Sequence, residues 1–308
     1  MPSVDESVVD RATPCWVCAG RVRAFWTDSA LDVVECVSCG HLQAAHRRAA
    51  DDASADYHRG YEQGAFVESL RITRLRQAGR LLDALTSWRA APRSLFDFGC
   101  GRGWLLEVAR ERGVPLLAGG DVSELALQLL AEHQITGLKL DPVSPFEKLD
   151  FQSLGFDPEV ITFLDVIEHF SGDLTQRLAA WLERLPSAAR VLVFKVPVRE
   201  GLLFSIAHRA RRLGVGGLQR QLFQVGTYPP HYQYFSRRSL ARFVSSLGLE
   251  TLGTLDDLDF EASGLAGRLT STLPLVRRLG GVAGHLLASA ATGLGRTDSR
   301  IVVAERRS

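Results

Sequence analysis

Four of the five cysteines form two C-x-x-C pairs, and their spacing indicates metal chemistry. The pairs, Cys15 with Cys18 and Cys36 with Cys39, are separated by seventeen residues. A C-x-x-C turn directs two sulfur atoms toward one point, and two such turns complete the tetrahedron of thiolates that Zn2+ prefers. Because four thiolates leave no open coordination position, we predict a structural Zn2+ in a small ribbon rather than a catalytic metal.

Disulfide bonds and a redox-active dithiol are the alternatives for these cysteines. Disulfides fit poorly, because the first residues of the chain show neither the basic nor the apolar stretch of a secretory signal. A redox pair is not expected twice at this spacing. Gly20 and Gly40 follow the two pairs and suit tight turns with positive φ, while His41 and His46 are interpreted as surface residues.

A glycine-rich turn after a predicted strand is the second feature that could do chemistry. The motif D-x-G-x-G-x-G is formed by Asp97, Gly99, Gly101 and Gly103. It differs from the dinucleotide fingerprint G-x-G-x-x-G, because Trp104 stands where that pattern needs glycine or alanine. Glycines let a ligand approach the backbone, the following helix N-terminus favours a ligand carboxylate, and Asp97 can receive a ligand ammonium. A ligand with an amino-acid end and a nucleoside end meets all these requirements.

This turn resembles the first motif of the class I S-adenosylmethionine-dependent methyltransferases. Further segments that resemble the same family follow in its order at 119–123, 163–170, 191–197 and 231–236. The resemblance covers about residues 90–255 and implies an α/β fold, a Rossmann-like sheet with helices on both faces. It also implies a transferase activity with S-adenosylmethionine as the cofactor.

The resemblance assigns cofactor-binding residues one by one. They are Asp97, Gly99, Gly101 and Gly103 in the turn, and Asp121, Val122, Asp141 and Asp165 after the next strands. A carboxylate such as Asp121 can accept hydrogen bonds from both ribose hydroxyls, although a charge at a helix N-terminus is the alternative. Asp141 is a candidate to bind the adenine amino group, and a simple turn fits it equally well.

Catalytic candidates follow from the chemistry of methyl transfer. Transfer from a sulfonium ion is an in-line displacement, so the protein mainly aligns the reactants and excludes water. A base is needed only where the acceptor must lose a proton. His231 and His169 are the candidate bases, with Tyr228 as polar lining. The alternatives are a structural role for His169 beside the Asp165 loop and simple packing for His231.

A narrower resemblance comes from a four-cysteine ribbon ahead of such a domain, as in the deoxysugar C-methyltransferases of natural-product pathways. Tyr228, His231, Tyr234 and Phe235 match their Tyr-His-Glu-His-x-x-Tyr-Phe-Ser segment, but two prolines replace the central His-Glu pair. Those enzymes also carry a further C-terminal domain. We therefore expect a small-molecule acceptor, such as a secondary metabolite, a saccharide or a lipid-linked compound, without specifying a deoxysugar.

Periodicity predicts the elements that must position these residues. We expect a zinc ribbon at 1–50, a linker with a helix at 51–92, and a methyltransferase domain at 93–308 whose alternating units build a parallel sheet. Strands are predicted at 94–98, 115–120, 138–140, 160–164, 191–196, 249–255 and 300–304, and helices at 66–88, 104–112, 124–133, 174–185 and 237–247. Two insertions, 199–230 and 260–296, interrupt the domain; the first is expected to cover the acceptor or, alternatively, to touch a membrane surface.

Composition narrows the classes of function. Lys and Arg number 36 against 35 Asp and Glu, a formal net charge of +1, which argues against a phosphate-binding groove and against nucleic acid as a partner. A zinc-ribbon rRNA methyltransferase and a non-catalytic cofactor-binding protein remain the alternatives. No apolar run reaches the ~20 residues of a membrane span, and the sequence predicts a cytoplasmic protein. The oligomeric state and the methylated atom are not predicted.

Overall fold

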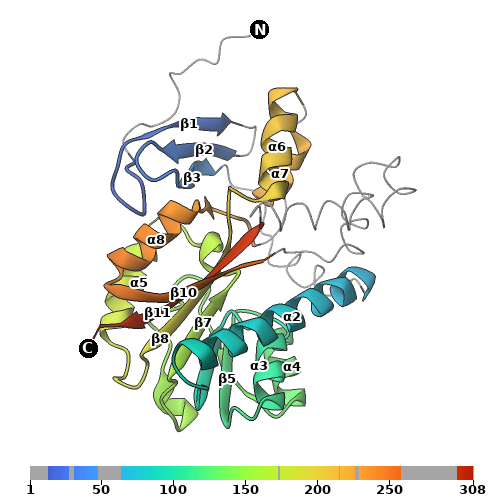
Figure 1. Cartoon of the computed structure of the whole chain (residues 1–308), viewed down its shortest axis with the longest axis vertical. Coiled ribbons are helices and arrows are strands. Elements are labelled where there is room, and N and C mark those ends of the chain that lie inside the picture. The colour runs from blue at the N-terminus through green and yellow to red at the C-terminus, as the bar shows by residue number, and fades with distance from the viewer. Residues whose placement is uncertain are drawn as a thin grey trace.

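The computed structural model describes residues 13–27, 31–47, 64–172, 174–214, 216–225, 229–257 and 297–307. Within these ranges the chain forms a seven-stranded sheet with helices on both faces and a separate four-stranded sheet (Figure 1). Tyr228 and the predicted insertion at 260–296 lie outside the described residues. No helix among the described residues combines the length and the hydropathy needed to cross a membrane.

The large sheet has the strand order β10-β11-β8-β7-β4-β5-β6. Its strands are β4 (Ser94–Phe98), β5 (Leu116–Asp121), β6 (Thr136–Lys139), β7 (Val160–Leu164), β8 (Val191–Pro197), β10 (Leu249–Asp257) and β11 (Ser299–Arg306). Neighbours from β6 to β8 are parallel, whereas β11 is antiparallel to both β8 and β10. The expectation of a parallel sheet is therefore wrong at β11, because Ser299 pairs with Asp257 and the chain re-enters at the end of the sheet where β10 leaves it.

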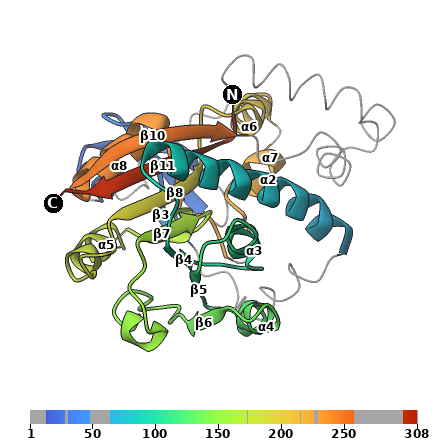
Figure 2. The same ribbon diagram turned by 60° about the horizontal axis from the view of Figure 1, so that its bottom comes forward.

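Five helices cover the two faces of this sheet (Figure 2). They are α2 (Gly64–Trp88), α3 (Trp104–Glu111), α4 (Glu124–Glu132), α5 (Leu174–Glu183) and α8 (Arg237–Ser246). Successive side chains of a strand point to opposite faces, so in β8 Val193 packs with the α2, α3 and α4 layer while Phe194 packs with α5 and α8. Apolar residues at both positions are what a strand buried on two faces requires.

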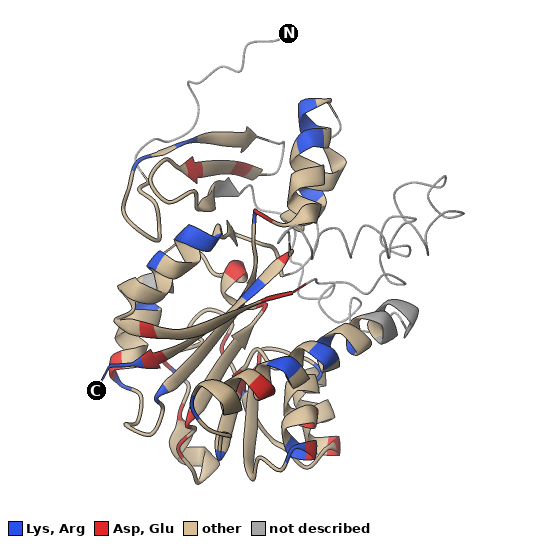
Figure 3. Ribbon diagram, in the orientation of Figure 1, with Lys and Arg blue, Asp and Glu red and all other residues tan. Residues whose placement is uncertain are grey.

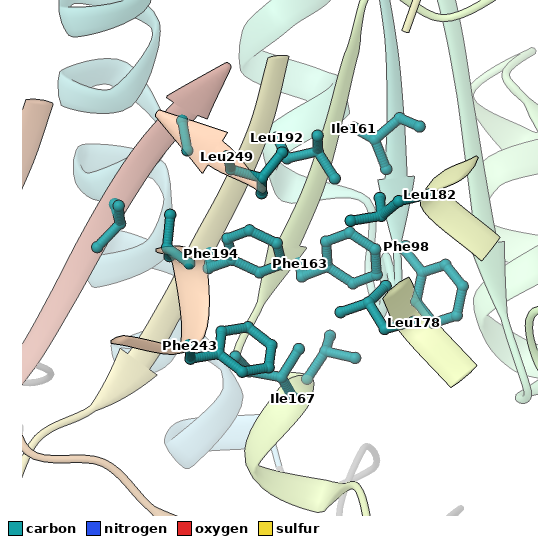
Figure 4. Close-up of a cluster of buried hydrophobic side chains, with 14 of the residues drawn as sticks. Phe98, Ile161, Phe163, Ile167, Leu178, Leu182, Leu192, Phe194, Phe243 and Leu249 are labelled. Carbon is teal, nitrogen blue, oxygen red and sulfur yellow. The ribbon is translucent and has the colours of Figure 1, made fainter. Parts of the chain in front are cut away.

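Aromatic rings join the carboxyl ends of the central strands (Figure 4). The ring of Phe163 in β7 lies 4.9 Å from that of Phe98 in β4 and 5.3 Å from that of Phe194 in β8, centroid to centroid. Phe243 of α8 packs edge-on against Phe194, with the ring centroids 5.6 Å apart. Truncating such a buried ring to alanine costs about 3–5 kcal/mol of stability. This packing fixes the edge from which the loops of the candidate site emerge.

The small sheet unites the cysteine-bearing segment with the rest of the chain. It contains β1 (Val22–Thr27), β2 (Leu31–Cys36), β3 (Leu42–Arg47) and β9 (Gln233–Tyr234) in that order. Leu42 pairs with Tyr234, so the last strand of this sheet comes from the segment at 93–308. Two segments that are about 190 residues apart in the sequence thus pair within one sheet.

The first insertion folds onto this small sheet. It forms α6 (Leu202–Arg212) and α7 (Gly217–Leu222), and buries Phe204 and Phe223 in a cluster with Trp26 and Leu31. The basic residues at the end of α6 form bands along the helix (Figure 3). Arg199 ties the insertion to β2, since its Nη1 lies 2.6 Å from Glu35 Oε1. The apolar face of the insertion therefore contacts the ribbon.

The predicted strands and helices of the large sheet are confirmed, each to within two residues at either end. Two short 3-10 helices were not predicted, η1 (Phe151–Leu154) and η2 (Ile167–His169), nor were β3 and β9. The helix η2 carries one candidate base, His169.

Candidate active site

The glycine-rich turn connects β4 to α3 and adopts a conformation that needs its glycines. Gly99, Gly101 and Gly103 have φ angles of +73°, +52° and +74°, in the left-handed region that side chains disfavour. A Cβ atom at Gly99 would lie 2.6 Å from Val166 Cγ2, and one at Gly103 would lie 2.8 Å from Leu130 Cδ2. The turn is thus a bare backbone cradle at the carboxyl edge of the sheet.

Asp121 ends β5 and is buried beside this cradle. Its Oδ2 accepts a hydrogen bond from Gly101 N at 2.8 Å, and its Oδ1 accepts one from Ser123 N, also at 2.8 Å. Ser123 caps α4, accepting from Ala126 N, so the serine performs the capping function that was the alternative for Asp121. The carboxylate itself braces the glycine turn, with the half-buried Val122 next to it.

Asp97 lies near the end of β4 with only 4% of its surface exposed. Thr162 of the neighbouring strand donates a hydrogen bond from Oγ1 to Asp97 Oδ1 at 2.5 Å. Burial raises the pKa of Asp97 to about 7, the hydrogen bond from Thr162 opposes the rise, and the charges of Asp121 and Asp165 add to it. A cationic ligand group beside this carboxyl would stabilise its ionised form.

Asp165 follows β7 and is held by two cations. Its Oδ1 lies 2.5 Å from Lys195 Nζ, and its Oδ2 lies 2.6 Å from Arg74 Nη2. The residue has a φ of +57°, which is unusual for a side chain other than glycine. Lys195 is 1% exposed, so this ion pair fixes the loop after β7 to β8, and Arg74 fixes it to α2.

Neither cation was predicted as part of the site. The sequence did contain a signal for Lys195, since it is one of only three lysines and interrupts an otherwise apolar strand. A charge inside a buried strand needs a partner, and the loop beside it supplies one.

Asp141 forms a turn after β6. Its Oδ1 accepts hydrogen bonds from Val143 N at 2.9 Å and from Ser144 N at 2.8 Å, and its Oδ2 pairs with Lys148. The Lys148 ammonium, together with these two amides, lowers the pKa of Asp141 to about 2. The turn that was the alternative interpretation is present, and contact with adenine stays a prediction.

The two predicted histidines lie together. The ring centroids of His169 and His231 are 4.9 Å apart, although 61 residues separate them in sequence. His169 Nδ1 lies 2.9 Å from the carbonyl oxygen of Pro230, and His231 Nδ1 lies 2.8 Å from that of Leu222. Because a carbonyl oxygen only accepts, each Nδ1 must carry the proton.

Glu168 joins this pair and had no predicted role. Glu168 is 1% exposed. One of its carboxylate oxygens and one ring nitrogen of each histidine lie within 4.8 Å of one another. The backbone N of Tyr232 donates to the carbonyl oxygen of Glu168 at 2.8 Å, and Gln233 Nε2 donates to that of Phe170 at 2.9 Å. These bonds hold η2 against the segment that carries His231.

Comparison with known proteins decides the family. A family model described as a methyltransferase domain matches residues 70–253, well over half of the chain. The chain belongs to this methyltransferase family. Both the Rossmann-like fold and an S-adenosylmethionine-dependent transferase enzyme, as expected from the sequence, are thereby confirmed. No curated protein matches the chain.

Solved structures resemble this methyltransferase only distantly. A geranyl diphosphate C-methyltransferase from Streptomyces coelicolor A3(2) has 15% identity and a TM-score of 0.49, over 84% of this chain and 90% of its own. An S-adenosylmethionine-dependent methyltransferase from Archaeoglobus fulgidus has 17% identity and a TM-score of 0.48, over 77% and 94%. Magnesium protoporphyrin IX methyltransferase from Synechocystis PCC 6803 has 17% identity and a TM-score of 0.47, over 82% and 94%.

The four cysteines of the ribbon converge as predicted. Sγ of Cys15 lies 3.6 Å from that of Cys39, and Sγ of Cys18 lies 3.5 Å from that of Cys36 and 3.6 Å from that of Cys39. No disulfide joins them. Four thiolates around Zn2+ at 2.3 Å would be about 3.8 Å apart, so the donor set fits a tetrahedral ion.

Two details of the ribbon differ from the sequence prediction. Gly40 has the expected positive φ, but after the first pair Ala19 takes the left-handed position instead of Gly20. Gly20 is needed for space, since a Cβ there would lie 3.2 Å from the sulfurs of Cys18 and Cys36. His41 is fully buried against Phe235 rather than on the surface, because β3 pairs with β9 and brings that ring over it.

Proposed function

We propose that this methyltransferase transfers a methyl group from S-adenosylmethionine to a small-molecule acceptor, such as a secondary metabolite, a saccharide or a lipid-linked compound. The observation that carries the proposal is the bare glycine cradle between two buried carboxylates, Asp97 and Asp121. A ligand with an ammonium group at one end and vicinal hydroxyls near the other matches those two charges.

The cofactor residues have separate tasks in this proposal. Gly99, Gly101 and Gly103 admit the amino-acid end to the N-terminus of α3, where backbone N–H groups favour its carboxylate. Asp97 receives the ammonium group, and Asp121 with Val122 borders the ribose. Asp141 lies beyond β6 on the adenine side. Asp165 positions the loop after β7 through its two ion pairs, and this loop contacts the cradle where Val166 approaches Gly99.

The acceptor side is proposed to lie at His169 and His231, with Tyr228 as further lining. Both imidazoles have their Nδ1 proton directed to a backbone carbonyl, so the lone pair of each neutral ring is on Nε2. That lone pair would take the proton that the acceptor loses, and bound S-adenosylmethionine would supply the methyl group and be left as a neutral thioether. The protein otherwise contributes alignment and exclusion of water.

A structural Zn2+ held by the four cysteines is proposed for the ribbon. The four thiolates supply the geometry without an open coordination position, so the ion stabilises the fold and takes no part in methyl transfer.

Two measurements test the proposed function. Calorimetry with S-adenosylmethionine and S-adenosylhomocysteine should show one site per chain, and absence of both would refute the cofactor assignment. A panel of small-molecule acceptors should then give turnover that His231→Ala abolishes while cofactor affinity is kept. His133→Ala, which removes an exposed imidazole at the end of α4, is the matched control and should leave turnover intact.

The RNA alternative is tested on the same protein. With a net charge of +1, binding to rRNA at moderate salt should be weak. Tight, salt-sensitive retardation of rRNA in a gel would replace the small-molecule acceptor with a nucleic acid.

A further inference from the structure

We propose that Glu168, His169 and His231 form a second metal site, which binds a divalent transition-metal ion where the acceptor is activated. The ligand atoms of the three side chains lie within 4.8 Å of one another. The proposal rests on the proposed function only for the placement of the acceptor; the metal site itself is argued from the geometry of the cluster.

The hydrogen bonds behind the two rings prepare them as ligands. Pro230 O accepts from Nδ1 of His169 at 2.9 Å, and Leu222 O accepts from Nδ1 of His231 at 2.8 Å. A carbonyl partner on one ring nitrogen fixes the tautomer and orients the other nitrogen, as is usual for histidines that bind metals. In both neutral rings the lone pair is thus on Nε2, which is the nitrogen available to bind an ion.

Three electron-pair donors therefore converge at one place. Glu168 contributes a carboxylate that is 1% exposed, and a cation beside a buried carboxylate offsets part of the cost of removing its charge from water. A proton can bind only one of these three donor atoms. A divalent cation can accept an electron pair from all three ligand atoms at once, and the two histidines are only partly buried.

The donor set selects the class of ion. Two imidazoles and one carboxylate are the protein ligands of catalytic Zn2+ sites and of sites for other first-row ions, and they leave coordination positions open. This contrasts with the four thiolates of the ribbon, which close their site. Ligand atoms around such an ion are about 3.4 Å apart, so small side-chain rotations from the present separations complete the site.

The open position gives the ion a task in methyl transfer. An acceptor hydroxyl bound there loses its proton to water, because coordination lowers the pKa of the oxygen. The oxygen lone pair then forms the new bond to the methyl carbon while the electrons of the carbon–sulfur bond move to sulfur. With the ion bound, His169 and His231 act as its ligands, and activation of the acceptor passes to the metal.

Cobalt titration of the full-length protein, with zinc already in the ribbon, tests the site. Wild-type protein should take up one Co2+ per chain and show visible ligand-field absorption without the thiolate-to-cobalt charge-transfer band that exchange into the ribbon would give. Glu168→Gln, His169→Ala and His231→Ala should each weaken this uptake by about a hundredfold or more. His133→Ala should bind Co2+ as the wild type does.

Cofactor calorimetry on the same samples separates the possible failures. A variant that binds S-adenosylmethionine normally but no longer takes up Co2+ is folded and supports the metal site. Wild-type protein that binds the cofactor without a second metal, or variants that keep full Co2+ uptake, would overturn the metal site and leave the proposed function standing. Loss of cofactor binding in the wild type would overturn the proposed function independently of the metal result.

Discussion

S-adenosylmethionine should bind more tightly as the pH rises toward neutrality, because Asp97 must ionise to receive its ammonium group. Burial raises the pKa of this carboxyl to about 7, so in the protein alone it is largely protonated in mildly acidic buffer. The cofactor ammonium favours the carboxylate, and binding below this pKa must first release the proton. The apparent affinity therefore follows the ionised fraction of Asp97.

The size of the effect follows from that pKa. The ionised fraction rises from about 9% at pH 6 to about 76% at pH 7.5, so affinity should increase about eightfold over this interval. The sign is set by the direction of the shift: a carboxyl with its ordinary pKa near 4 would already be ionised throughout, and affinity would then not respond to pH.

Calorimetric titration at several pH values measures this slope, and 5′-methylthioadenosine is the matched control ligand. It retains the nucleoside and its 5′ sulfur, as a neutral thioether, but lacks the amino-acid end, so its affinity should stay constant while that of S-adenosylmethionine rises. The substitution Asp97→Asn should weaken the binding of S-adenosylmethionine and make its affinity nearly independent of pH. Equal pH profiles for the two ligands, or an unchanged slope in Asp97→Asn, would refute the reasoning.

Three further outcomes are expected. Thr162→Val removes a hydrogen bond to the carboxylate worth ~1.5–3 kcal/mol, so the midpoint of the affinity profile should move up by about one pH unit or more; a fixed midpoint would exclude that coupling. Removing the ribose hydroxyls from the ligand should cost ~1.5–3 kcal/mol in wild type but little in Asp121→Ala, and equal losses would assign Asp121 to bracing the turn alone. Stripping the ribbon metal with a chelator should speed amide exchange at Leu42 and Tyr234 but not at Phe163, and uniform exchange would contradict a local role.

Local sequence pattern was sufficient for most of the large sheet and for the glycine cradle. Alternation and helical spacing act over a few residues, and the left-handed φ of Gly99 and Gly103 expresses a steric need that glycine alone meets. The direction of β11 could not be inferred, because it depends on which end of the sheet the chain re-enters after a long insertion. The cysteine spacing predicted convergence of the sulfurs, and the positive φ was predicted correctly at Gly40, but in the first turn it falls on Ala19 instead of Gly20.

Long-range pairing explains what the sequence did not reveal about the site. Glu168 was visible beside His169, but its meeting with His231 depends on a hydrogen-bonded contact between η2 and the segment before β9. β9 has two residues, too few for any periodic signal. The burial of His41 has the same origin, since the partner ring belongs to Phe235, nearly two hundred residues away.

The cofactor-binding half and the acceptor-binding half of the site are held by different parts of the fold. The cofactor half stands on β4, β5 and β7 and on the aromatic packing that joins their ends, whereas His231 lies directly before β9, which belongs to the ribbon sheet. The α7 carbonyl of Leu222 that orients the His231 ring belongs to the insertion packed on that same ribbon. A disturbance of the ribbon should therefore reach the acceptor half first. We therefore expect removal of the ribbon metal to lower turnover before it lowers cofactor affinity, although the cysteines pack in the same apolar core as Phe98 and Val166.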